Sequence, residues 1–265
     1  MIRLTALDLA LAALLVLALA AASVALRLGV ARQLVVSAAR TVLQLLLIGL
    51  VLKLLFAQDH PLWVALMATV MLAAAGREVS VRQKHGLAGL WGFGLGTLAM
   101  FVSSFAVTVL ALLTVIGNHP WYAPQYAIPL LGMVLGNTMN GIALALDRLT
   151  HEATSRRAAI ETRLALGESA AQAIADSRRE AMRVGMIPII NAMAAAGIVS
   201  LPGMMTGQIL AGSPPVEAVK YQILVMFLIA GGTGFGTLVA VSLAARRLFD
   251  DRHRLRLDRL RAGRP

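Results

Sequence analysis

The chain has no cysteine among its 265 residues, which excludes disulfide bonds and thiolate metal sites. Charged residues are scarce as well: they make up 14% of the chain, against about 25% in typical soluble domains. Hydrophobic residues make up 58% and come in long blocks, and the mean hydropathy is +0.78. The sequence therefore predicts an all-α, polytopic membrane helix bundle.

Signatures of catalysis are missing too. No GxxxxGK[ST] phosphate loop occurs, and none of the three lysines follows a glycine. The five histidines are scattered and show no HExxH spacing, so a zinc protease of that type is excluded. The chain is therefore predicted not to be an enzyme and to need no cofactor, and its residues alone assign no metal site.

Long apolar stretches predict the membrane-spanning helices. A helix needs about 20 apolar residues to cross the hydrocarbon core of a bilayer. We expect about seven such helices in a single permease domain over residues 1–265, at roughly 4–26, 34–57, 61–76, 87–117, 127–146, 184–201 and 221–245.

Arginine and lysine are distributed unevenly between the loops. One alternate set of loops holds most of them, in groups at residues 27–32, 77–84, 148–183 and 246–264, whereas the other set holds only Arg3, Lys53 and Lys220. Basic residues gather on the cytoplasmic side of membranes. The N-terminus is thus predicted outside and the C-terminus in the cytoplasm, with a basic tail over residues 246–265, in a multi-pass protein of the inner membrane. The same rule accounts for the net charge of +11, so the lipid bilayer, and not nucleic acid, is the expected partner.

A few polar residues fall inside the predicted spans. Polar groups are costly in lipid, so they face either a neighbouring helix or a path through the protein. Both interpretations stay open for the amides, and Arg40 could instead extend to the inner boundary. The candidates for a translocation path are Arg40, Gln44, Asn137, Asn140, Asn191 and Gln208.

An apolar segment near residues 200–215 is interrupted by proline and glycine, which break helices. We expect a short re-entrant or interfacial piece on the outer side, because irregular backbone at membrane depth needs protein or water around it. Its methionines could be soft metal ligands, but packing is the more common role of this residue. The segment includes Pro202, Gly203, Met204, Met205 and Gly207.

A long polar stretch, residues 147–183, interrupts the apolar blocks. From Ile160 onward, apolar or small residues recur at three- and four-residue spacing, which predicts an amphipathic helix. Such a helix could lie on the inner leaflet or dock a partner, and periodicity alone favours neither. The residues expected to couple the chain to a partner are Glu161, Leu164, Gly167, Ala171 and Ile174.

The chain resembles the FetB-type permeases of ABC exporters, which are related to plant permease subunits linked to aluminium tolerance. The resemblance rests on IPLLGMVLGNTMNGIALALDRL (128–149), ETRLALGESAAQAI (161–174), the long run from Arg179 to Ile223, and the GGTGFG that follows. It implies a separate cytosolic ABC ATPase subunit and export of a metal such as iron. Glu161 and Gly167 keep the spacing of the EAA-type docking loop of many ABC permeases, but Thr162 and Arg163 replace its alanines.

The leading hypothesis is therefore a homodimeric ABC permease subunit, driven by a separate ATPase. The alternative is a gradient-driven secondary transporter of a metal or small solute. Proton coupling calls for a buried carboxylate or histidine within the membrane, and only Asp8 and Glu78 come near that position. A regulatory or scaffold subunit is the third possibility.

Overall fold

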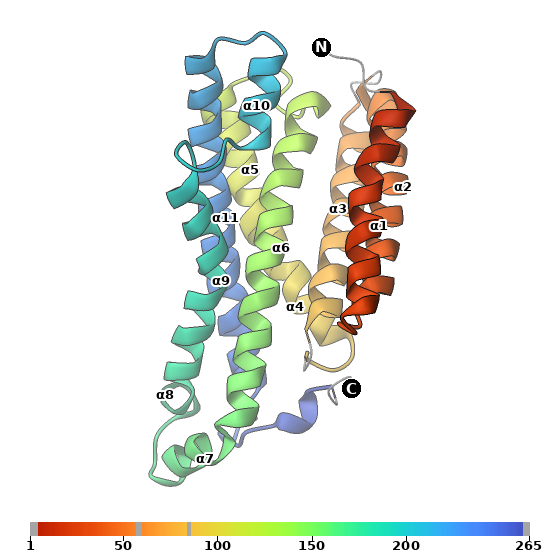
Figure 1. The fold of residues 1–265 in the computed structure, drawn as a ribbon. Coiled ribbons are helices and arrows are strands. Elements are labelled where there is room, and N and C mark those ends of the chain that lie inside the picture. The colour runs from red at the N-terminus through yellow and green to blue at the C-terminus, as the bar shows by residue number, and fades with distance from the viewer. Residues whose placement is uncertain (1–4, 57–59, 84–85, 262–265) are drawn as a thin grey trace. The chain divides into compact units, whose positions relative to one another are not determined.

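The computed structural model describes residues 5–56, 60–83 and 86–261, and every regular element within these ranges is a helix (Figure 1). The all-α polytopic fold is thereby confirmed. Contacts divide the chain into two compact units, Met1–Asp59 and His60–Pro265, each described here by itself. The expectation of one permease domain stays a prediction.

The first unit is a pair of packed helices, α1 (Ala6–Ala25) and α2 (Ala31–Phe56). A capping box begins α1: the Asp8 carboxylate accepts from the Thr5 N–H at 2.7 Å, and the Thr5 hydroxyl accepts from the Asp8 N–H at 3.4 Å. The Asp8 carboxylate thus satisfies the N–H group of the N-cap residue, and the Thr5 hydroxyl satisfies one free N–H group of the first turn. This role accounts for a carboxylate at the edge of an apolar span without invoking proton transfer.

The second unit is built around α6 (Pro124–Ser155), which packs against α3 (Pro61–Arg82), α9 (Ala175–Ala195) and α11 (Pro215–Arg247). Between α3 and α6 the chain forms one long helix with two π-helical turns. Its parts are α4 (Leu90–Met100), η1 (Phe101–Phe105), α5 (Ala106–Ala111) and η2 (Leu112–Ile116). Short helices complete the unit: α7 (Arg157–Ala165), α8 (Ala170–Ala173), α10 (Gly203–Leu210) and η3 (Leu257–Arg259).

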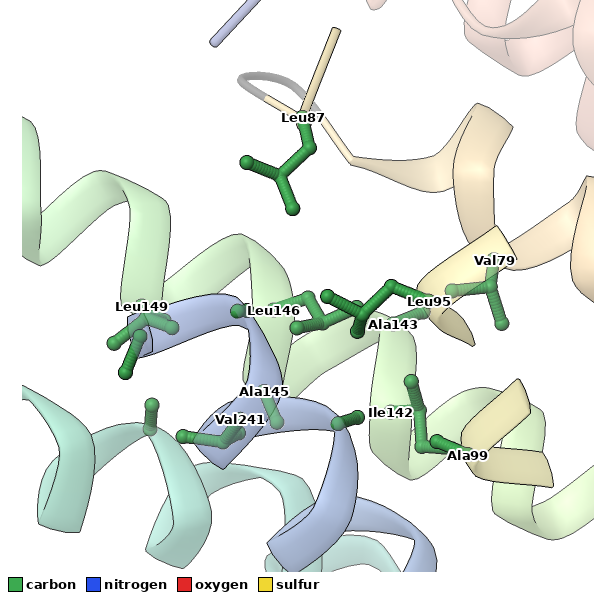
Figure 2. Packing of buried hydrophobic residues seen from close by; sticks show 14 of the residues in the cluster. Val79, Leu87, Leu95, Ala99, Ile142, Ala143, Ala145, Leu146, Leu149 and Val241 are labelled. Atoms are coloured by element: carbon green, nitrogen blue, oxygen red, sulfur yellow. The ribbon is translucent and has the colours of Figure 1, made fainter. Parts of the chain in front are cut away.

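The core of the second unit lies where α3, α4, α6 and α11 meet (Figure 2). Many of its fully buried residues are small, such as Ala99 on α4, Ala145 on α6 and Ala240 on α11. Lipid tails are as apolar as leucine, so burying an apolar side chain between helices gains little in a membrane. Small residues instead let the helix backbones approach and maximise van der Waals contact, which is the packing that holds this bundle together.

Six helices of the described chain are long and apolar enough to cross a membrane: α1, α2, α3, the helix from Leu90 to Ile116, α6 and α11. The predicted span at 184–201 is not among them. Its helix, α9, begins at Ala175 with a charged first half and ends at Ala195, and a break follows before α10. Figure 1 shows α9 and α10 one after the other beside α11. Residues 196–201 are mostly apolar although they are not helical. Hydropathy alone therefore included the break after α9 in the predicted span 184–201.

Other predicted boundaries also move. The third span was placed at 61–76 but α3 continues to Arg82, and the fifth was placed at 127–146 but α6 continues to Ser155. Hydropathy falls at these ends while the backbone hydrogen bonds of the helix continue, so composition underestimates helix length. Residues 4 and 57, at the predicted ends of the first two spans, lie outside the described residues.

Candidate functional site

The polar stretch 147–183 consists of the end of α6, the short helices α7 and α8, and the start of α9. The expectation of one continuous amphipathic helix from Ile160 to Ile174 is wrong. Gly167 has a φ of +95°, in the left-handed region that glycine adopts without steric cost, and its N–H bonds to the Leu164 carbonyl at 3.0 Å. This glycine ends α7 and reverses the chain, which makes a compact turn at the tip of the loop.

The predicted stripe divides into buried and exposed residues at this turn. Ile160 and Ile174 belong to the buried core and Leu164 packs against it, whereas Gly167 and Ala171 are exposed. Leu166 at the tip is 79% exposed. Sequence reasoning missed Leu166 because it lies off the helical stripe; its place next to the turn-forming Gly167 was the available signal.

Ion pairs fix the shape of this loop. The Arg163 guanidinium donates to Glu168 at 2.7 Å and to Asp176 at 3.0 Å, which ties α7 to the turn and to α9. The hydrogen bond to Glu168, and then that to Asp176, raise the pKa of Arg163 above its ordinary value. Glu161 pairs with Arg157 one turn earlier at 2.8 Å. The loop therefore has a defined conformation in which Leu166 is held outward.

The C-terminal segment is folded against the same end of the bundle as this loop. Its backbone pairs with residues 86–88: the Ala88 N–H donates to the Arg259 carbonyl and the Arg261 N–H to the Gly86 carbonyl, both at 2.8 Å. The Arg259 guanidinium donates to the carbonyls of Arg247 and Phe249, at the end of α11. Leucines from this segment pack on the core, so the predicted basic tail is an ordered part of the unit as far as residue 261.

A groove of about 630 Å³ separates the loop from the C-terminal segment, lined by Glu161, Leu164, Gly167, Glu168, Arg252, His253, Arg254 and Leu255. The Ala170 N–H donates to Nδ1 of His253 at 3.3 Å and bridges its two walls. Asp250 accepts from the N–H groups of Arg254 and Arg252 and from the Arg254 side chain. These contacts, that of the Arg254 N–H first, lower the pKa of Asp250 to about 2. The loop and the C-terminal turn thus form one surface.

The candidate path residues lie in several environments. Arg40 and Gln44 are exposed on α2, in the first unit. On α6, Asn137 donates to the Met133 carbonyl of its own helix, whereas Asn140 accepts from Arg82 of α3. Asn191 is exposed on α9, and Gln208 on α10 is half-buried. The Arg82–Asn140 contact was not anticipated, because Arg82 was assigned to a loop.

The interrupted segment forms α10 and the break before it. A cavity of about 540 Å³ lies between this break and α11; its lining includes Met193, Pro202, Met205, Gln222 and Met226. Met205 is buried while Met204 is half-buried, and a Cβ on Gly203 or Gly207 would meet nothing within 4 Å. Over the described residues, no group of three or more histidine, aspartate or glutamate side chains could hold a metal ion.

A family model described as an uncharacterised protein family, UPF0014, matches residues 6–249. The chain belongs to this family. It is 40% identical to a UPF0014 membrane protein of Synechocystis, over 84% of this chain and 85% of the relative. It is 33% identical to the probable iron export permease protein FetB of Escherichia coli, over 85% of both chains. It is 31% identical to the protein ALUMINUM SENSITIVE 3 of Arabidopsis thaliana, over 84% of this chain and 80% of the relative. No solved structure matches the chain.

Membership in the family confirms the resemblance to FetB-type permeases, and it agrees with six apolar helices in a multi-pass membrane protein. The family match ends at residue 249. It therefore includes the loop with Leu166 and Gly167 but not the C-terminal turn that forms the other wall of the groove.

Proposed function

We propose that this chain is the permease subunit of an ABC exporter of a metal such as iron, driven by a separate cytosolic ATPase. The observation that carries the proposal is the similarity, over 85% of both chains, to a protein named as an iron export permease. No phosphate-loop signature occurs in the sequence, so the energy for transport comes from a partner under this proposal.

The arrangement of basic residues supports an orientation with this end of the second unit in the cytoplasm. The α3–α4 connection, the α7–α8 loop and the C-terminal segment lie at one end of the unit, joined by the contacts of Ala88 with Arg259 and of Ala170 with His253 (Figure 1). Basic residues concentrate in and next to these segments, in the groups at residues 77–84, 148–183 and 246–264. Because such residues gather on the cytoplasmic side, we place the C-terminus in the cytoplasm. With the N-terminus outside, the chain must cross the inner membrane an odd number of times, so in this proposal α9 and α10 together form a seventh crossing besides the six long apolar helices.

The docking surface in this proposal is the tip of the α7–α8 loop. Leu166 is an exposed apolar side chain on a turn held by ion pairs, and burying it against a partner would remove its apolar surface from water. Ile160 and Ile174 are buried in the core, so the loop is anchored at both ends and a push on its tip is passed to α6 and α9. Glu161, Leu164 and Gly167 line the adjacent groove, which gives the ATPase a second contact.

The exposed amides support a path beside α6 and a second copy of the chain. Asn137 and Asn140 are exposed on α6 and Asn191 on α9, where contact with lipid would leave amide groups partly unsatisfied. A homodimer that faces these helices toward a polar passage satisfies them. Gln208 is a further candidate for this passage, and the segment with Met204 and Met205 is proposed to adjoin its outer end. Arg40 and Gln44 of the first unit stay candidate path residues by themselves.

The test is co-purification with, and stimulation of, the ATPase encoded with this chain. We expect Leu166→Glu to abolish stimulation of ATP hydrolysis in proteoliposomes, because a charge replaces the apolar anchor. Ala158→Glu adds the same charge at an exposed position of α7 and is expected to retain it. If Leu166→Glu stimulates hydrolysis like the parent, the docking site is wrong. Iron efflux without ATP or partner, abolished by an uncoupler, would overturn the whole proposal in favour of a gradient-driven transporter.

A further inference from the structure

Six hydroxyl groups of the second unit are buried without a hydrogen-bond partner among the described residues. One belongs to Thr108 of α5, and the other five belong to Ser103 and Ser104 of η1, Thr138 of α6, and Thr233 and Thr237 of α11. None of the five side chains is more than 4% exposed. Buried polar groups in folded proteins nearly always have a partner, so a cluster of unpartnered ones calls for a physical reason.

These hydroxyls gather along one glycine-containing face of α11. A Cβ on Gly236 would lie 2.7 Å from the Ser103 hydroxyl oxygen and 2.8 Å from the Thr138 methyl carbon. On the α6 side, a Cβ on Gly141 would lie 2.6 Å from the Thr233 methyl carbon and 3.4 Å from the Thr237 hydroxyl oxygen. The hydroxyl seam, defined as Ser103, Ser104, Thr138, Thr233 and Thr237, therefore runs along the contacts that α11 makes with η1 and α6.

Other threonines of this chain show that a partner was available. The hydroxyls of Thr97, Thr114 and Thr150 each donate to the carbonyl four residues earlier, at 2.7, 2.7 and 3.0 Å. This bond to the preceding turn is the usual way for a threonine in a helix to satisfy its hydroxyl. The seam threonines also lie in helices, yet their hydroxyls make no such bond, and those of Thr138 and Thr237 lie near Gly232 of α11 and Gly141 of α6 instead.

The seam also includes an irregular turn. Ser103 and Ser104 lie in η1, one of two π-helical turns in the helix from Leu90 to Ile116. Single π-helical turns occur frequently at functional sites, and they cost hydrogen-bond geometry that a regular helix would keep. A regular α-helix through residues 101–105 would rotate the two serines relative to α11. The turn therefore places hydroxyls where packing alone would favour apolar residues.

We propose that the hydroxyl seam is a closed part of the translocation path, which opens when α11 separates from η1 and α6. This inference rests on the proposed permease function. In the open state the five hydroxyls face water, and their oxygens replace part of the water shell of a hard cation. Hydroxyl oxygens are neutral, hard ligands like water itself. A route lined only by such groups exchanges ligands with a passing ion without holding it, as conduction requires.

Asn137 and Thr138 are consecutive residues of α6 whose side chains point to different sides of that helix. The seam therefore adjoins the side of α6 that carries the exposed amide of Asn137. Separation of α11 from α6 would therefore join the seam to the passage proposed beside Asn137. All five seam side chains are neutral. A cation route through them would need no acidic metal site, and none occurs among the described residues.

The test uses the natural absence of cysteine, because every introduced thiol is the only one in the chain. Thr138→Cys and Thr237→Cys are treated with the charged reagent 2-(trimethylammonium)ethyl methanethiosulfonate, which reacts only with water-accessible thiols. Val79→Cys on α3 is the control, because Val79 is also 0% exposed but packs against Gly96 of α4, away from the contacts of α11 with η1 and α6. Reaction is followed in membranes without nucleotide, with ATP and after vanadate trapping. We expect the seam thiols to react at least tenfold faster than the control in one of these states.

Reaction of both seam thiols at the rate of the Val79→Cys thiol in all three states would overturn the inference. Stimulation of the ATPase is measured in the same samples. If stimulation is present and the seam stays unreactive, only the seam proposal fails; if there is no stimulation but the seam thiols react, only the ATPase proposal fails.

A second measurement separates a path from a structural role. Thr237→Val keeps the shape of the side chain and removes only the unpartnered hydroxyl, so a purely structural role predicts unchanged or higher stability and parental iron(II) efflux. The path predicts several-fold lower iron(II) efflux in proteoliposomes at undiminished stability, with recovery in Thr237→Ser. Thr150→Val, which removes a hydroxyl bonded to the Leu146 carbonyl, is the control. Parental efflux by Thr237→Val would overturn the inference.

Discussion

The contact between α6, α9 and α11 gives the most direct prediction about stability. Gly141 of α6 lies so close to its neighbours that an added Cβ would meet the Thr233 methyl carbon at 2.6 Å and the Gly185 carbonyl oxygen at 2.8 Å. Both distances are below 3.0 Å, and one of the two atoms is backbone. Substitution by alanine must therefore move a helix or distort the side chains between them.

The size of the effect follows from two opposing terms. Overpacking of a close contact typically costs about 1–3 kcal/mol, whereas alanine in place of glycine inside a helix gains about 0.8–1.0 kcal/mol. Gly141→Ala is thus expected to lower the free energy of unfolding by up to about 2 kcal/mol. Gly136 lies in the same helix with nothing within 4 Å of an added Cβ, so Gly136→Ala is expected to gain up to about 1 kcal/mol.

The assay is denaturation of both variants and the parent in the same detergent, followed by circular dichroism. The difference between the two variants cancels the gain in helix propensity and measures overpacking alone. Thr233→Ser removes the methyl group at 2.6 Å and is expected to restore part of the loss in the Gly141→Ala background, because the Gly185 carbonyl still limits the approach. Equal stability of the two alanine variants would refute the close packing of α6 against α11.

Three further predictions concern the C-terminal segment. The carboxylate of Asp250 has a pKa lowered from its ordinary value of 3.8 to about 2. Its stabilising contribution is therefore complete above pH 3.8 and is lost as the pH falls through about 2. The difference in protease resistance of the segment between the parent and Asp250→Asn should shrink over that range. Arg259→Ala removes two hydrogen bonds to carbonyls at the end of α11 and should accelerate proteolysis after residue 249, measured by mass spectrometry. An unchanged rate of proteolysis would show that these hydrogen bonds do not hold the segment in place. The Arg247 guanidinium lies 4.5 Å from the centre of the Trp91 ring, so Trp91→Leu should cost about 0.5–1 kcal/mol in unfolding experiments, and an unchanged stability would show that the contact contributes nothing.

The membrane character of the chain and the existence of most of its spans could be predicted from composition. Long apolar blocks such as those of α1, α2 and α11 have few alternatives, because their residues are excluded from water and a helix satisfies the backbone within itself. The position of α9 could not be predicted in this way. Its charged first half follows α8 of the polar loop and its apolar second half ends at a break, so hydropathy averaged over a window combined two different structures.

The candidate site, too, could be predicted from the sequence only in part. The spacing of Glu161 and Gly167 indicated a coupling loop, and the glycine does end α7. The exposed side chain of Leu166 and the groove shared with the C-terminal turn were not predicted, because both depend on a chain reversal and on contacts between segments far apart in sequence. Whether the amides of Asn137, Asn140 and Asn191 line a path stays a prediction.

The amino-acid sequence by itself determined that this is a membrane protein made of helices, since apolar side chains in blocks of that length are stable only in lipid and the backbone there must bond within each helix. Only the tertiary structure decided which polar groups lack partners. In the sequence, nothing distinguishes Thr138 and Thr237 from Thr97 and Thr150. In the structure, the hydroxyls of Thr97 and Thr150 bond to carbonyls of their own helices, whereas those of Thr138 and Thr237 are turned to neighbouring helices. The packing of α11 against η1 and α6 decides which hydroxyls bond within their own helix, and no local sequence pattern indicates that packing.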